Sequence, residues 1–171
     1  PKTIMKKLLL TAVDVFALTT VTAQTEKGSL LIETNIANQM VGTTSFSLLS
    51  ADGEIVYSLG LDGGYFIMDD LAIKVGLGYA AESVSDSNVF SYRLGAKYYL
   101  MSKIPLTLDY TGAIIKDYDE NPSWVGLGAG YAIFLGSNVS IEPGLRYNVS
   151  MNDKFSKENL IQLNIGFALH F

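Results

Sequence analysis

Apolar side chains occupy every second position in one segment after another, from about residue 30 to the end of the chain. The alternation is clearest over residues 161–171, where large apolar residues alternate with small or polar ones. Strict alternation over this length is typical of a β-strand with two different faces and does not arise from the period of a helix. We therefore predict eight strands. They cover residues 30–48, 55–67, 71–81, 90–100, 104–114, 125–135, 139–149 and 161–171.

The connections between these segments are alternately short and long. The tight ones cover residues 68–70, 101–103 and 135–138, and the longer polar ones cover residues 50–53, 82–88, 117–123 and 151–158. Short connections between neighbouring strands are typical of antiparallel hairpins. The pattern therefore predicts an all-β, antiparallel, up-and-down arrangement whose first strand has a kink or break near Asn38 and Gln39.

The composition of the two faces indicates which one meets water. One face consists mainly of Gly, Ala, Ser and Thr, which suits the narrow lumen of a closed eight-stranded barrel better than a solvated surface. The other face is apolar, and its segments have the length of about 9–11 residues that a tilted strand needs to cross a bilayer. Eight tyrosines on this face would form an aromatic girdle at the bilayer interfaces. They are Tyr57, Tyr65, Tyr79, Tyr92, Tyr98, Tyr110, Tyr131 and Tyr147.

These two faces predict an eight-stranded transmembrane β-barrel with its apolar side toward lipid. A soluble, lipocalin-like ligand-binding barrel would turn its apolar side inward, and it is the alternative that the alternation leaves open.

Charged side chains of both signs fall on the lumen face in equal number. They are Glu33, Asp62, Lys74, Arg93, Lys97, Asp109, Glu142 and Arg146. We predict that they form a compensating network, because an unpaired buried charge is costly. An eight-stranded barrel is just wide enough for its side chains to fill it, which favours a closed polar lumen. A narrow channel for small solutes, with these charges as a selectivity ring, is the alternative.

The start of the chain has the pattern of a secretory signal peptide. Two lysines precede an apolar run over residues 8–21. Small residues then occupy the −3 and −1 positions of a cleavage site, at Val21 and Ala23. The pattern predicts cleavage after Ala23, with residues 1–4 as a short N-terminal extension and residues 24–171 as the barrel domain. Asp14 within the apolar run and the extension itself depart from the usual pattern.

The last residues carry a more specific signal. Asn164, Gly166, Leu169 and Phe171 are spaced as polar-x-Gly-x-x-hydrophobic-x-aromatic, which resembles the signal read by the barrel-assembly machinery. With the signal peptide, the eight strands and the short turns on one rim, the mature chain resembles the small outer-membrane β-barrels of Gram-negative bacteria. The likeness is to the OmpX/OmpW and OmpA-barrel type, the outer membrane protein beta-barrel domain family. It implies periplasmic termini, outer loops facing the exterior, and the assembly machinery, lipid and lipopolysaccharide as partners.

Composition removes several classes of function. The chain of 171 residues is 49% hydrophobic and 17% charged, with one histidine and no cysteine, so thiol chemistry and cysteine-based zinc sites are excluded. A net charge of −5 argues against nucleic acid as a partner. His170 lies beside the predicted periplasmic end, where an interface or lumen-mouth residue is expected rather than a catalytic one. The acidic loop 117–120 is expected to be solvated, so no metal and no cofactor are predicted.

The sequence therefore predicts a cell-envelope protein without enzyme activity. It would be an integral outer-membrane barrel with a structural or surface-interaction role: envelope integrity, adhesion, or membership of an envelope complex through a protein partner.

Overall fold

A computed structural model describes residues 25–37, 46–51, 54–82 and 88–171. The predicted signal peptide and the predicted break at Asn38 and Gln39 lie outside these residues. The described strands are β1 (Leu30–Ala37), β2 (Ser47–Ala51), β3 (Glu54–Met68), β4 (Leu71–Glu82), β5 (Asn88–Leu100), β6 (Ile104–Ile115), β7 (Ser123–Gly130), β8 (Ile133–Phe134), β9 (Val139–Ser150) and β10 (Leu160–His170). Within this part of the chain, no helix is long and apolar enough to span a membrane.

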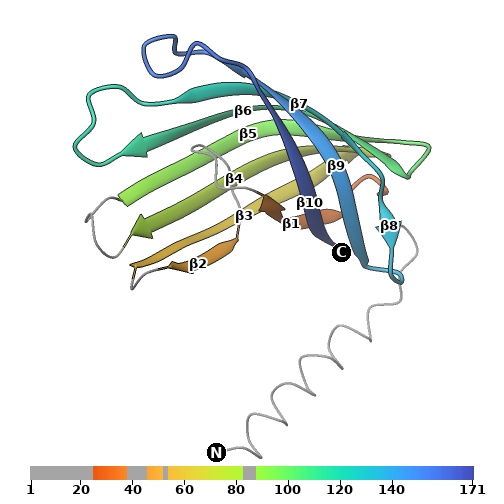
Figure 1. The fold of residues 1–171 in the computed structure, drawn as a ribbon. Helices are drawn as coiled ribbons and strands as arrows, with labels where there is room; N and C mark the ends of the chain where they lie inside the picture. Colours follow the sequence, from red (N-terminus) through yellow and green to blue (C-terminus); the bar gives the residue numbers. More distant parts are fainter. Residues whose placement is uncertain (1–24, 38–45, 52–53, 83–87) are drawn as a thin grey trace, which may run out of the picture.

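The strands form one closed, antiparallel, up-and-down barrel. From β3 to β7, and again from β9 to β10, each strand pairs with its sequence neighbours; β7 also pairs with β9, and β1 completes the wall by pairing with both β3 and β10. The ten segments make an eight-stranded wall, because β2 continues the pairing of β1 along β3, and β8 continues the pairing of β7 along β9. Figure 1 shows the tight turns at one end of the barrel and the long connections at the other. The predicted fold class is confirmed.

One predicted strand differs from the structure in its continuity. The alternation predicts a single strand over residues 125–135, but β7 ends at Gly130 and β8 begins at Ile133. The backbone keeps its register between them, since the Ala132 amide donates to the Lys103 carbonyl at 2.7 Å and the Tyr131 amide donates to the Pro143 carbonyl at 3.0 Å. The strand is interrupted because Pro143 has no amide proton to donate back to Tyr131. The side chains keep their alternation through this break, since Tyr131 and Ile133 are exposed while Ala132 is buried.

The register fixes the shape of the barrel. Following paired residues once around the wall from His170 in β10 leads back to β10 at Leu160, ten residues away along the strand. For eight strands about 4.7 Å apart and about 3.3 Å per residue, this shear tilts the strands by about 40° from the barrel axis. That value lies within the range of membrane-spanning barrels.

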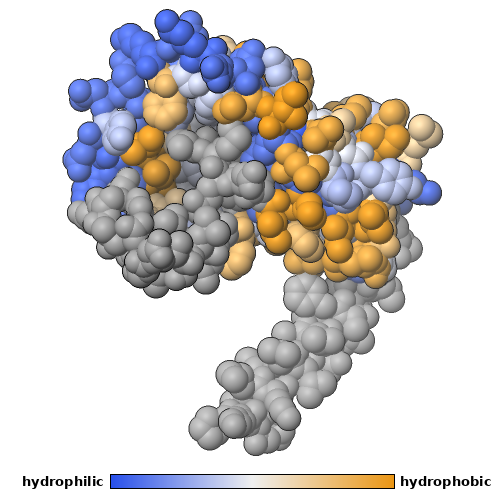
Figure 2. Space-filling model, viewed as in Figure 1, coloured by the Kyte–Doolittle hydropathy of each residue, from blue (hydrophilic) through white to orange (hydrophobic). Residues whose placement is uncertain are grey.

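The wall separates an apolar exterior from a polar interior. Large apolar side chains on the outer positions are exposed, as in Leu61, Leu77, Leu127 and Leu163, whereas nearly all charged residues of the strands are buried inside. Figure 2 shows apolar residues gathered over the barrel wall and hydrophilic ones over the long-loop end. This is the reverse of a soluble barrel, in which the apolar residues fill the interior.

The apolar exterior has the height of a membrane core. On β3, exposed apolar residues run from Tyr57 to Met68, and on β5 and the turn after it they run from Phe90 to Met101. At the tilt above, each run rises by about 28 Å, close to the apolar band of about 25 Å in membrane barrels.

Several lumen glycines give neighbouring side chains their space. A Cβ added at Gly95 would lie 2.7 Å from the Cα of Asp109 on β6, which no side-chain rotation can relieve. A Cβ at Gly126 would collide with the guanidinium of Arg146. The small residues predicted to line the lumen therefore let larger polar ones cross it.

We predict that Gly95→Ala lowers the free energy of unfolding by about 2 kcal/mol, because the added methyl group overpacks the β5–β6 contact. Gly63→Ala on β3 is the matched control, since no atom lies within 4 Å of the added Cβ there. Urea unfolding of the two refolded variants in lipid vesicles measures the difference. Equal stability of the two variants would contradict the packing described here.

Candidate functional site

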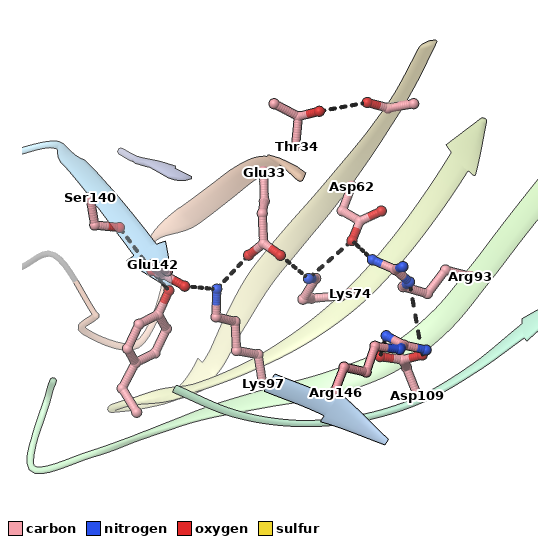
Figure 3. A network of polar contacts seen from close by, with 12 residues as sticks. Glu33, Thr34, Asp62, Lys74, Arg93, Lys97, Asp109, Ser140, Glu142 and Arg146 are labelled. Carbon is pink, nitrogen blue, oxygen red and sulfur yellow. Dashed lines mark hydrogen bonds and ion pairs between the residues drawn. The ribbon is translucent and has the colours of Figure 1, made fainter. Parts of the chain in front are cut away.

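A chain of polar contacts runs through the lumen (Figure 3). Eight residues with alternating charge form its centre, and all of them are buried. In order of contact they are Glu142, Lys97, Glu33, Lys74, Asp62, Arg93, Asp109 and Arg146. They are the same eight residues that the alternation places on the lumen face, and they come from β1, β3, β4, β5, β6 and β9. We call this chain the lumen network.

The lysines of the lumen network each join two carboxylates. Lys97 Nζ lies 2.5 Å from Glu33 Oε2 and also contacts Glu142. Lys74 Nζ lies 2.6 Å from Glu33 Oε1 and 3.0 Å from Asp62 Oδ2. Glu33 and Asp62 are paired directly across the β1–β3 contact. Like charges directly opposite one another destabilise a strand pair, so Lys74 compensates a repulsion at this contact.

The arginines continue the lumen network toward the long-loop end. Arg93 Nη1 lies 2.7 Å from Asp62, and its Nε lies 3.8 Å from Asp109. Arg146 binds Asp109 through both terminal nitrogens, at 2.6 and 2.5 Å, and donates from Nε to Asn148 at 2.6 Å. A bidentate contact of this kind fixes the orientation of both side chains.

At the tight-turn end, an aromatic cluster closes the lumen below the charges. His170 packs against Phe66, Tyr99 and Phe134, with ring centroids 5.5 to 6.3 Å apart. Phe66, Tyr99 and His170 are buried. We call these four residues the aromatic floor. The lumen is thus occupied by rings at one end and by ion pairs along its length, as expected for a barrel of this diameter.

The only histidine lies beside a serine, but the pair has no access to a substrate. His170 Nε2 is 3.1 Å from Ser140 Oγ, which itself donates to Glu142 Oε1 at 2.8 Å. All three residues are buried, and the carboxylate binds the serine rather than the histidine. The side chain of His170 points into the barrel as part of the aromatic floor, which agrees with the lumen-mouth alternative of the prediction and not with the interface alternative.

The predicted girdle tyrosines are all on the outer surface, each between 36% and 51% exposed. They fall into two groups along the barrel. Tyr65, Tyr98 and Tyr131 lie near the tight turns, and Tyr57, Tyr79, Tyr92, Tyr110 and Tyr147 lie toward the long connections. Asn159 Nδ2 in the loop before β10 donates to the Tyr147 hydroxyl at 2.9 Å.

The four residues of the predicted assembly signal lie along β10 and just beyond it. Asn164 and Gly166 face the lumen, Leu169 lies half-buried on the outer side, and Phe171 is exposed at the end of the chain. Their alternation places the two apolar members, Leu169 and Phe171, on the outer side of the last strand.

Two long connections are joined to each other outside the lumen. Lys154 Nζ in the β9–β10 loop lies 3.1 Å from Glu120 in the β6–β7 loop, and Asn152 Nδ2 donates to Glu120 and to the Asn121 carbonyl. The hydrogen bond from Lys154 lowers the pKa of the exposed Glu120 carboxyl, with a further contribution from Asn152. The acidic stretch around Glu120 forms no group of ligands that could hold a metal ion, nor does any other described part of the chain.

Comparison with solved structures agrees with this architecture. The N-terminal β-barrel domain of Pseudomonas aeruginosa OprF is 17% identical, covers 85% of this chain and 98% of its own, and superimposes with a TM-score of 0.51. The Yersinia pestis outer membrane protein Ail (16% identity, 85% of this chain, 100% of its own) and de novo designed transmembrane β-barrels (16%, 86% and 99%) both give TM-scores of 0.48. No protein-family model and no curated protein matches the chain.

The closed register, the apolar exterior and the charged interior define an eight-stranded β-barrel of the transmembrane class. At these identities the structural likeness establishes the fold alone.

We expect Lys74→Met to lower the free energy of unfolding by about 3 kcal/mol or more, because it leaves Glu33 and Asp62 opposed without their shared cation. Adding Glu33→Gln to this variant should restore part of the loss. Lys154→Met is the control, since an exposed ion pair contributes at most about 1 kcal/mol. Urea unfolding in vesicles compares the three variants, and a Lys74 loss no larger than that of the control would contradict the role assigned to Lys74.

The loop contact predicts a pH dependence of its own. Because the pKa of Glu120 is lowered by Lys154, the contact is present above that pKa and is lost as the pH falls through it. An NMR titration of the Glu120 carboxyl should show its pKa rising toward the ordinary value in Lys154→Met and staying unchanged in Lys157→Met. The same pKa in all three proteins would show that Lys154 does not bind Glu120 in solution.

Proposed function

We propose that the chain is an integral outer-membrane protein with a closed lumen, which supports a surface or structural role in the cell envelope and has no enzyme activity. The observation that supports this proposal is that the two faces of the wall differ. An exposed apolar band lies outside, and a continuous lumen network with compensated charges lies inside. Outer membranes are where β-barrels with this facing occur.

Transport is disfavoured by the contents of the lumen. Any solute that crosses must separate Arg146 from Asp109 and pass Lys97, which is held by two carboxylates. It must then displace the rings of the aromatic floor. Breaking a buried ion pair leaves an uncompensated charge and is strongly destabilising. The lumen network therefore supports a closed barrel over the narrow channel that the sequence left as an alternative.

The long-loop end supports a role at the surface. The joined β6–β7 and β9–β10 loops form one composite face on which Tyr118 is 63% exposed. Exposed tyrosines are common anchors in protein interfaces because they add contact area at low entropic cost. We propose that this face contacts lipopolysaccharide or an envelope protein, while the last strand, with Leu169 and Phe171, is recognised by the assembly machinery.

Two measurements on the full chain test this proposal. The protein should be recovered in the outer-membrane fraction, and its gel mobility should change on heating, since the barrel stays folded in unheated detergent. In planar bilayers it should be electrically silent, with a barrel of known conductance as the positive control. A soluble periplasmic product would contradict the membrane location, and a stable conductance would favour the channel.

A further inference from the structure

Beside the lumen network lies an internal cavity of about 50 Å³. It is lined by charged groups of the network and by the small residues Gly128, Gly130, Gly144 and Gly166. Asn35 and Asn164 also line the cavity. About 10–15 Å³ of such space holds one water molecule, so the cavity has room for about three or four.

Three polar atoms of the cavity wall are buried and have no hydrogen-bond partner among the described residues. They are Asn35 Nδ2, Asn164 Oδ1 and Arg93 Nε, the last of which lies 3.8 Å from Asp109 in an ion pair. The Asn35 side chain is only 6% exposed. A buried donor or acceptor without a partner costs about 1–3 kcal/mol, so these two amides call for a bound group that accepts from one and donates to the other.

The two asparagines lie on the strands that close the barrel. Asn35 is on β1 and pairs with Gly166, two positions along β10 from Asn164. Diagonal neighbours of this kind on one face of a sheet have side chains within about 7–8 Å of each other. One water molecule with two hydrogen bonds spans most of such a gap, whereas the amides themselves do not meet.

Charge around the cavity favours water over an ion. The lining contains Lys74, Arg93, Lys97 and Arg146 against Glu33, Asp109 and Glu142, and the remaining positive charge is matched by Asp62, which contacts both Lys74 and Arg93. A balanced lining offers no net attraction to a cation or an anion. Unpartnered donors and an unpartnered acceptor in one lining match the capacity of water both to accept and to donate hydrogen bonds.

We propose that this cavity is a binding site for ordered water, and that a water molecule bridging Asn35 and Asn164 joins the first strand of the barrel to the last. Asn164 then has a structural role in the closed barrel that is separate from its predicted part in the assembly signal. The bridge lies on the lumen side of the β1–β10 ladder and adds a contact where the two ends of the sheet meet.

A double-mutant cycle on the full chain in lipid vesicles tests the bridge. If water joins the two amides, Asn35→Leu and Asn164→Leu each lower the urea midpoint, and the double variant lowers it by clearly less than the sum. If the site is dry, each substitution removes an unpartnered polar atom, so the midpoint rises or stays, and the effects add. Asn148→Leu combined with Asn164→Leu is the control pair, because Asn148 lies outside the cavity lining, and it should be additive.

A measurement on the unmodified protein covers the case in which a variant does not fold. In lipid nanodiscs, the side-chain amide protons of Asn35 should show a direct nuclear Overhauser effect from bound water. Absence of that signal from an assigned amide would overturn the proposal. So would a shift of the Asn35 resonance when chloride or sodium is replaced by a larger ion, because it would identify a bound ion instead.

Discussion

The compensation of charge inside a narrow lumen is the constraint on which the rest of this barrel depends. Eight buried charges are tolerated only because each contacts at least one of opposite sign. Their contacts cross from β1 to β9 and link six strands. A wall whose exterior is apolar gains nothing from burying apolar groups when it sits in lipid, so polar contacts of this kind inside the barrel carry more of its specificity.

The same constraint explains the lumen glycines and the composition of the β1–β3 contact. Long side chains can cross the lumen only where the opposite positions are small, as Gly126 is for Arg146 and Gly95 is for Asp109. At the β1–β3 contact two carboxylates face one another, and Lys74 allows them to do so. Lys74 therefore contributes both to the neutrality of the lumen and to the pairing of β1 with β3.

Much of this could be predicted from the alternation of residues, because a period of two fixes the face on which each side chain lies. It assigned Glu33, Lys97 and Arg146 to the interior without any knowledge of their partners. It could not say that Lys97 bridges Glu33 and Glu142, since those residues are far apart in the sequence and meet only through the shear of the closed barrel. Nor could it place the ring of His170, whose packing against Phe66 and Phe134 depends on three strands arriving at the same level.

The break between β7 and β8 shows a different limit. The side-chain pattern continues across Tyr131 and Ala132, so alternation alone carries no trace of the return hydrogen bond that Pro143 cannot donate to Tyr131. Exposure of side chains and continuity of a hydrogen-bond ladder are separate properties. The alternation of residues predicts the exposure of side chains but not the continuity of the hydrogen-bond ladder.

The central claim is the direction in which the two faces point, and contact with lipid tests it most directly. In nanodiscs, methyl groups of Leu61, Leu127 and Leu163 should show nuclear Overhauser effects to lipid acyl chains, whereas the methyl groups of Leu31, buried inside the barrel, should show none. Acyl-chain contacts at Leu31, or their absence at the three outer leucines in a folded protein, would contradict the account.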